Sequence, residues 1–306
     1  MTGDRRGGGL RLMSVHAHAD DESITMGRTL AVLAARGVGL CNVCCTDGEL
    51  ASIVATDMPE ETTRPRLGAI RREELRGACA ALGVERVEFL GYHDSGMAGS
   101  ATARRAEAFA MQPVGDAAER ICALVRDFRP HVVVTYDAYG GYGHPDHIQT
   151  HRATLVAVEA AHHGAVFPGA GPPWRVSKLY YTAFPKSTLQ RMIDLALAAG
   201  MPHPFDGRGV DELEFATPDE LATTTVDAGA GVAAQRAALR AHHSQIDESF
   251  GLLTVPEEVL RDVFGAEHYQ LAMSRVPVEL PETDLFAGVE PDRAVEGGVA
   301  PAATLP

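Results

Sequence analysis

Two short segments of the chain gather residue types that bind metals and move protons. The first is His16-Ala17-His18-Ala19-Asp20-Asp21-Glu22, and the second is Gly143-His144-Pro145-Asp146-His147. A zinc site of two histidines and one carboxylate keeps a fourth position open, which is typical of catalytic zinc. Acidic residues that open a helix can instead cap it and favour its dipole. Capping does not explain two histidines beside three carboxylates, so we expect a catalytic metal site built from both segments.

Each segment lies between an expected strand and an expected helix. An apolar strand at residues 10–15 precedes the first segment, and a helical pattern that stops at Gly37 follows it. The second segment follows the most strand-like run, residues 131–136, and opens a helix at 148–162. In open α/β sheets the chemistry lies at the carboxyl ends of the strands. We therefore expect both segments at one edge of a sheet.

The rest of the chain continues this alternation of strands and helices. We expect strands at residues 38–46, 87–90 and 178–184, and helices at 69–82, 117–128, 189–199 and 228–246. Residues 52–67 are expected to form a loop, residues 100–115 a mobile flap, and residues 200–225 a turn-rich excursion. Parallel strands joined by right-handed crossovers are the expected topology. A Gly-x-Gly-x-x-Gly motif after the first strand is missing, which disfavours dinucleotide binding.

Length and charge limit the classes of protein that fit. The 306 residues can bury a full core. We expect one domain, with an α/β metal-binding core at 10–165, a substrate-side elaboration at 166–290 and a loose tail at 291–306. A net charge of −14 argues against nucleic acid or an anionic membrane as partner. The N-terminus lacks the apolar core of a signal peptide, and no apolar run reaches membrane-spanning length.

The five cysteines favour a reducing compartment. Cys41-x-x-Cys44 could indicate a redox or zinc motif, but residues three apart on a strand point to opposite faces. Buried, reduced thiols are the simpler interpretation, and they predict a cytoplasmic protein.

Several further runs match one known family. They are Asp94-Ser95-Gly96-Met97-Ala98-Gly99, Arg129-Pro130-His131-Val132-Val133-Val134-Thr135-Tyr136-Asp137, Ser177-Lys178-Leu179-Tyr180-Tyr181 with Trp174 before it, Leu239-Arg240-Ala241-His242-His243-Ser244-Gln245-Ile246, and Pro281-Glu282-Thr283-Asp284-Leu285-Phe286-Ala287-Gly288. With the two His-rich segments, these runs make the sequence resemble the zinc-dependent LmbE-like or PIG-L N-deacetylases, in particular the mycothiol-pathway branch. The resemblance covers nearly the whole chain and implies a Rossmann-like α/β fold, with a mostly parallel sheet and helices on both faces.

The resemblance also implies a metal site and a base. It assigns one Zn²⁺ per chain to His18, Asp21 and His147, and Fe²⁺ or Co²⁺ can substitute because affinity alone does not select zinc. Asp20 matches the general base of the family, which takes a proton from water. Zinc lowers the pKa of bound water to roughly 7 and polarises a carbonyl, which suits hydrolysis of an amide.

Other residues match positions around the reacting amide. His144 matches the residue that assists the tetrahedral intermediate or protonates the leaving amine, and Asp146 matches the carboxylate that orients it. We expect that carboxylate to hold the pKa of His144 above its usual 6.5. Tyr142 matches a mobile tyrosine that donates to the oxyanion. The positions that match residues binding the sugar part of the substrate are Arg71, Asp94 and Met97. Ala19 stands where the family usually has proline, which should loosen the turn that aims Asp20.

The substrate stays open at this point. The expected partner is a small N-acylated amino sugar. The sequence does not decide whether copies of the chain associate with one another. Gly143 and the run 94–99 look like the deacetylase of N-acetylglucosaminyl-inositol, whereas the amidase of mycothiol S-conjugates usually has Lys at the position of Thr25 and Pro at that of Gly143. The tail from Trp174 looks more like the amidase. Further alternatives are a tailoring deacetylase of natural-product biosynthesis, a sugar-binding homologue without turnover and, least favoured, a metal-dependent phosphohydrolase.

Overall fold

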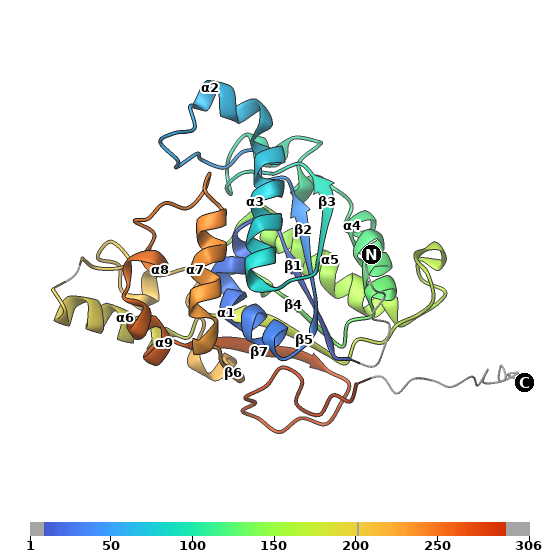
Figure 1. Ribbon diagram of the computed structural model, residues 1–306. Coiled ribbons are helices and arrows are strands. Elements are labelled where there is room, and N and C mark those ends of the chain that lie inside the picture. The colour runs from blue at the N-terminus through green and yellow to red at the C-terminus, as the bar shows by residue number, and fades with distance from the viewer. Residues whose placement is uncertain (1–8, 201, 292–306) are drawn as a thin grey trace, which may run out of the picture.

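A single twisted sheet forms the centre of the computed structural model, which describes residues 9–200 and 202–291 (Figure 1). Within these ranges the strands are β1 Arg11–His16, β2 Gly39–Thr46, β3 Arg86–Tyr92, β4 Val132–Thr135, β5 Lys178–Ala183, β6 Thr224–Asp227 and β7 Ala266–Ser274. Their order is β3-β2-β1-β4-β5-β7-β6. The pairs from β3 to β5 are parallel, whereas β7 runs antiparallel to both β5 and β6. The expected mostly parallel α/β sheet is therefore confirmed.

Helices cover both faces of this sheet. They are α1 Asp21–Ala35, α2 Glu60–Thr63, α3 Leu67–Leu82, α4 Val114–Phe128, α5 Pro145–Ala161, α6 Lys186–Ala198, α7 Val232–Ala241, α8 Gly251–Thr254 and α9 Glu257–Asp262. Figure 1 shows α1, α3 and α7 on one face, and α4 and α5 on the other. Each group encloses its own hydrophobic core against the sheet. Because β4 is covered on both faces, its Val132, Val133 and Val134 are completely buried.

The chain reverses its direction of winding between β1 and β4. From β1 the sheet grows outward through β2 and β3, and from β4 it grows the opposite way through β5. Adjacent parallel strands whose connections lead in opposite directions leave a crevice at their carboxyl ends, where ligands bind in open α/β sheets. The two His-rich segments directly follow these two strands, so the topology brings them to the same crevice.

The expected elements differ from the observed ones mainly in the C-terminal half. β6 and β7 were not expected, and β7 is hard to detect because its second residue, Glu267, is charged yet buried. Glu267 accepts hydrogen bonds from the backbone N–H groups of Arg28 and Thr29 in α1, which compensates its burial. The helix expected at 228–246 is shorter, Val232–Ala241, and α2 forms inside the expected loop 52–67.

Two segments were predicted to be mobile or loosely held. The expected flap at 100–115 contains short 3₁₀ turns and a completely buried Phe109, and its mobility stays a prediction. Most of the predicted loose tail, residues 292–306, lies outside the described residues. In the part of the chain that the structure describes, no helix has both the length and the apolar character needed to cross a bilayer.

Candidate metal centre and active-site pocket

Three potential metal ligands converge at the crevice between β1 and β4. Nδ1 of His18 lies 3.2 Å from Nε2 of His147 and 3.6 Å from Oδ2 of Asp21, and Nε2 of His147 lies 3.5 Å from the same Oδ2. A tetrahedral zinc ion with bonds of about 2.0–2.1 Å places its ligand atoms roughly 3.3 Å apart. The three donor atoms therefore fit one zinc-sized ion, with a fourth direction left for water or substrate.

Hydrogen bonds orient both histidine rings for this role. Nδ1 of His147 lies 3.1 Å from the carbonyl oxygen of Gly140, so the N–H of the neutral ring points there and Nε2 keeps its lone pair. Nε2 of His18 lies 3.3 Å from Oδ2 of Asp146, which leaves Nδ1 for the metal side. Partners of this kind select the tautomer and raise the basicity of metal-binding histidines. Asp21 is held by the Tyr136 hydroxyl, which donates to Oδ2 at 2.6 Å.

The charges around His18 favour a cation at this point. Burial alone would lower the pKa of His18, but the carboxylates of Asp146 and Asp21 raise it to about 10. Burial lowers the pKa of His147 to about 3, so its ring is neutral near pH 7. Burial opposes ionisation of Asp21, yet His147 and His18 hold its pKa well below the usual range. Without a metal the His18 ring is therefore protonated near pH 7, and a bound metal ion would displace the proton from its Nδ1. With neutral His147 and ionised Asp21, it then makes a suitable donor set for zinc.

The loop before α5 allows His147 to reach the site. Gly140 has φ +68°, and a Cβ built there would lie 2.6 Å from Cβ of His147 and 2.8 Å from the backbone nitrogen of Ile148. A residue with a side chain would both strain this turn and displace the first turn of α5. Glycine at this position therefore allows His147 to take its place in the candidate metal site.

Asp20 stands beside the three ligands in a strained backbone conformation. Its φ is +108°, which is unusual for a residue other than glycine and is typical of functional sites. Arg71 holds the turn, because its guanidinium donates to the carbonyl of Ala19 at 2.5 Å, to the carbonyl of Gly48 at 2.8 Å and to Oδ2 of Asp20 at 3.1 Å. These bonds restrain the turn in which Ala19 replaces the proline usual in the family.

Other histidines and carboxylates near these ligands also come close enough together to hold a metal ion. Two groupings bring their ligand atoms within 4.8 Å of one another: His18, His144 and His147; and His18, Asp94, His144 and Asp146. His144 is less available, because its Nδ1 accepts a hydrogen bond from the backbone N–H of Asp146. The Asp146 carboxylate already accepts hydrogen bonds from the Ser95 hydroxyl and from the Ser95 N–H at 2.9 Å. The donor atoms of His18, Asp21 and His147 lie 3.2–3.6 Å apart, and this set stays the candidate ligand set.

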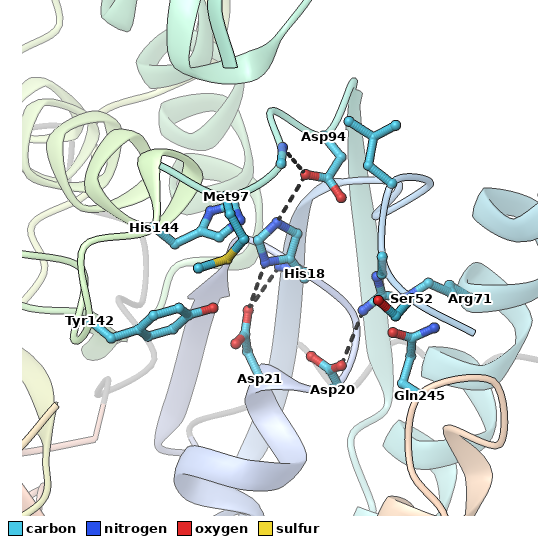
Figure 2. A pocket seen from close by; sticks show the side chains of 13 residues that line it. His18, Asp20, Asp21, Ser52, Arg71, Asp94, Met97, Tyr142, His144 and Gln245 are labelled. Carbon is cyan, nitrogen blue, oxygen red and sulfur yellow. Dashed lines mark hydrogen bonds and ion pairs between the residues drawn. The ribbon is translucent and has the colours of Figure 1, made fainter. Parts of the chain in front are cut away.

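A cavity of about 280 Å³ opens in front of the ligands (Figure 2). Eight of its lining residues belong to the predicted site: His18, Asp20, Asp21, Arg71, Asp94, Met97, Tyr142 and His144. Figure 2 shows Tyr142 and Met97 on one side of His18, with Asp20, Arg71 and Gln245 on the other. His147 and Asp146 do not line the cavity, and both side chains are buried.

Comparison with known proteins gives the family. A family model described as "PIG-L: GlcNAc-PI de-N-acetylase" matches residues 13–158. A protein of Thermomonospora curvata, named 1D-myo-inositol 2-acetamido-2-deoxy-alpha-D-glucopyranoside deacetylase, is 42% identical over 270 residues, which cover 85% of this chain and 90% of the relative. A protein of Geodermatophilus obscurus with the same name is 40% identical over 287 residues, 91% and 98% of the two chains. The chain belongs to the PIG-L family.

Solved structures share the fold. The N,N'-diacetylchitobiose deacetylase of Pyrococcus horikoshii superposes with a TM-score of 0.58 at 19% identity and covers 85% of this chain and 83% of its own. The 4-carboxy-2-hydroxymuconate hydratase of Pseudomonas putida KT2440 superposes with a TM-score of 0.61 at 21% identity, with 89% and 99% covered. A hydratase and a deacetylase on one fold show that chemistry must be argued from the site.

In this PIG-L family member, the arrangement of Asp146 and His144 differs from the one expected from the sequence. The hydrogen bonds of the Asp146 carboxylate go to His18 and Ser95 rather than to the His144 ring. Because Asp146 follows the helix cap by two residues, it is its backbone N–H that reaches Nδ1 of His144. Burial, followed by the charge of His18, lowers the pKa of His144 to about 4, so the expected rise is wrong. A neutral His144 carries its proton on Nε2.

Five lining residues of the cavity were not anticipated. They are Leu50, Ala51, Ser52, Gly96 and Gln245. Gly96 and Gln245 belong to motifs that carry the family resemblance, which was the available signal for them. Residues 50–52 follow an ordinary turn at Asp47-Gly48-Glu49, and only the fold brings them over the site. His16 and Glu22 of the first segment do not line the cavity, and both are completely buried.

Proposed function

We propose that this PIG-L family member is a zinc-dependent hydrolase that removes the acetyl group from the amino sugar of N-acetylglucosaminyl-inositol. The observation that carries the proposal is the set of three donor atoms 3.2–3.6 Å apart, beside Asp20 and in front of a cavity. The names of relatives about 40% identical over most of the chain support the same reaction and substrate.

His18, Asp21 and His147 would hold the zinc ion. When bound, zinc supplies Lewis acidity that makes the amide carbonyl more electrophilic and water more acidic. Burial raises the pKa of Asp20 to about 6, and the Arg71 guanidinium opposes that rise. A carboxylate with this pKa is largely ionised at neutral pH, yet it can accept a proton from water and give it up again.

The proton balance assigns roles to Asp20 and His144. Water adds its oxygen to the carbonyl carbon of the amide, and its proton passes to Asp20. The C–N bond then breaks as Asp20 passes that proton to the amine nitrogen. The products are the free amine and acetic acid, which releases its remaining proton to solvent and departs as acetate. Nε2–H of neutral His144 can donate to the carbonyl oxygen as negative charge develops there. Tyr142 keeps its hydroxyl proton, since burial raises its pKa, and it can serve as a second donor.

The side chains around the cavity are suited to a sugar. Asp94 is buried, its Oδ1 accepts from the N–H of Gly96 at 2.7 Å, and it faces the cavity as a potential acceptor for a hydroxyl group. Met97 is 58% exposed at the mouth and offers an apolar contact for one face of a sugar ring. Arg71 lines the cavity, although the turn at Ala19 and Asp20 already uses much of its guanidinium.

The loop at Gly143 favours the deacetylase over the conjugate amidase. Gly143 has φ +84°, whereas proline, which the amidase usually has here, is restricted to φ near −65°. The loop that carries Tyr142 and His144 therefore has a conformation that proline cannot adopt.

We also propose a cytoplasmic location. All five cysteines are buried and unpaired, and burial raises the thiol pKa of each of them. Such thiols are typical of proteins in a reducing compartment.

One experiment tests the proposed function. The purified protein is analysed for metal and assayed for amine release from N-acetylglucosaminyl-inositol and, in parallel, from a mycothiol S-conjugate. We expect about one zinc per chain and preference for the acetylated substrate. His147→Ala should lose metal and activity together. Full metal content in that variant would refute the ligand assignment, and preference for the S-conjugate would refute the substrate.

A further inference from the structure

We infer that Glu22 and His242 act as positioning residues for Asp20. The inference rests on the proposed function, because it assigns to this pair the support of the proposed base. Neither side chain faces the cavity, and both are completely buried. The mechanism above does not use them, so their burial and pairing need a separate explanation.

Glu22 joins the backbone of Asp20 to the C-terminal half of the chain. Its Oε2 accepts the backbone N–H of Asp20 at 3.0 Å. Its Oε1 accepts from Nε2 of His242 at 2.8 Å and from the Ser23 hydroxyl at 2.5 Å. Both oxygens of the carboxylate are thus occupied, one by the turn and the other by side chains.

The turn at Asp20 needs such support. A φ of +108° is unfavourable for a residue with a side chain and persists only where neighbouring groups impose it. Arg71 secures the turn on one side through the Ala19 carbonyl and the Asp20 carboxylate, and Glu22 secures it on the other through the Asp20 N–H. Loss of Glu22 would leave a backbone donor without its partner and allow the peptide, and with it the carboxylate, to rotate.

His242 is itself held in place by helix packing. It follows α7, which packs against α1, and Nε2 of Gln235 in α7 donates to the carbonyl of Ser23 at 2.9 Å. Two residues later, Ser244 bonds to Glu74 of α3 and to the N–H of Val54. A residue 220 positions after Glu22 in the chain thereby fixes the rotamer of that glutamate.

The alternative is that the pair only stabilises the core. Glu267 offers a matched control, because it too is a buried carboxylate that accepts backbone N–H groups of α1. It bonds Thr29 at 2.8 Å and Arg28 at 3.3 Å, beyond the non-helical backbone at Met26 that separates this part of α1 from Asp20. A purely structural role predicts similar behaviour for variants of Glu22 and Glu267.

The experiment compares Glu22→Ala, Glu22→Gln, His242→Ala and Glu267→Gln with the full-length wild type. Metal content, melting temperature, kcat and KM for N-acetylglucosaminyl-inositol are measured for each. We expect kcat to fall roughly 10–100-fold in Glu22→Ala and His242→Ala, with KM and metal content unchanged. Glu22→Gln should recover most of the rate, because its amide oxygen still accepts the Asp20 N–H. Glu267→Gln should lower the melting temperature and leave kcat unchanged.

Hydrogen exchange of the peptide that contains Asp20 supplies a readout without turnover. Exchange should rise there in His242→Ala and in Glu22→Ala but not in Glu267→Gln. Wild-type kcat and wild-type exchange in a folded, metal-loaded His242→Ala protein would overturn the inference, and so would equal losses of kcat in the Glu267 control. If Glu22→Ala does not fold, His242→Ala and Glu22→Gln decide. An inactive wild type would refute the proposed function instead, and the exchange data would still judge the positioning role.

Discussion

Asp20 and Asp21 are neighbours in the chain, but their surroundings give them different chemistry. Asp21 accepts a hydrogen bond from the Tyr136 hydroxyl, and His147 and His18 hold its pKa well below the usual range in spite of its burial. Asp20 faces the cavity, where burial raises its pKa to about 6 against the opposing charge of Arg71. When two nearby carboxyl groups have different surroundings, their pKa values differ, and each can take a different role in the site. Asp21 is suited to bind a cation and Asp20 to move a proton.

Asp20→Asn tests the second role. The asparagine has nearly the same shape but cannot accept a proton, so kcat should fall roughly 10²–10⁴-fold. Because the three proposed ligands are untouched, metal content should equal that of the wild type. Steady-state kinetics on metal-analysed protein check both values. A variant with bound metal and normal kcat would remove Asp20 from the mechanism.

Asp146→Asn tests whether this carboxylate serves His18 or His144. Its Oδ2 lies 3.3 Å from Nε2 of His18, so the substitution should weaken the tautomer control of that ligand. We expect the affinity for zinc to fall about 10–100-fold, as measured by competition with a chelator. Ser95→Ala, which removes only a neighbour of the same carboxylate, is the control and should have a smaller effect. Unchanged affinity with a lower kcat would instead point to His144.

At the scale of elements, the loop between β4 and α5 is as important as the residues it carries. Gly140 and Gly141 both have positive φ, +68° and +74°. A Cβ at Gly140 would meet His147 at 2.6 Å, whereas a Cβ at Gly141 would have no atom within 4 Å. The two positions therefore separate backbone strain from steric displacement of the ligand.

Gly141→Ala should reduce the free energy of unfolding by roughly 1–2 kcal/mol, the usual cost of a left-handed alanine, with metal content unchanged. Gly140→Ala should be less stable still and should lose metal, because His147 must move. Urea unfolding and metal analysis of both variants measure these effects. Equal metal content in the two variants would show that the loop tolerates a side chain at Gly140.

At the scale of the whole molecule, a C-terminal segment around Glu282 pairs with the backbone of Thr223 and Thr225 beside β6. Lys178, the first residue of β5, forms a buried ion pair with Glu282, and the Tyr180 hydroxyl donates to the same carboxylate at 2.6 Å. Lys178 lies at the amino end of a parallel strand, on the edge of the sheet opposite the metal centre. This cluster therefore bears on stability rather than on catalysis.

Glu282→Ala would leave the Lys178 ammonium buried without its partner. Loss of one member of a buried pair typically destabilises a protein by about 3–5 kcal/mol. Denaturant unfolding should show a decrease of this size, while kcat of the folded enzyme stays at the wild-type value. A large change in kcat would mean that the segment influences the site from a distance.

The stability of the molecule should also depend on pH through His242 and Glu22. Burial opposes both charges, but Glu22 raises the pKa of His242 above its usual 6.5, and His242 lowers the pKa of Glu22 below its usual 4.5. The contribution of His242 is complete below pH 6.5 and is lost as the pH rises through the raised pKa. That of Glu22 is complete above pH 4.5 and is lost as the pH falls through the lowered pKa.

The pair should therefore stabilise the protein most between about pH 4.5 and 6.5. In His242→Gln, the loss of stability on the alkaline side of this window should become smaller, because glutamine does not titrate. Unfolding free energies measured across pH for both proteins check the sign. An identical alkaline slope in the variant would assign that slope to another group.

The order of residues along the chain was sufficient to predict the α/β class, the strand before each His-rich segment and the convergence of the two segments at one edge of the sheet. These features are local, because strand patterns and short motifs are formed by residues that are consecutive in the chain. The five parallel strands from β1 to β5 were predicted to within a few residues for this reason. The strand β7 was missed because buried Glu267 depends on partners in α1, more than 200 residues earlier.

Only the tertiary structure decided how the site is assembled. The family resemblance assigned Asp146 to His144, but in the fold its carboxylate lies against His18, which follows β1 and is 128 residues away in the chain. Likewise, no local pattern links Glu22 to His242, nor Ser52 to the cavity. Hydrogen-bond partners, burial and the pKa shifts that follow from them are properties of groups brought together in space. They depend on which elements pack side by side, and sequence order alone does not contain that information.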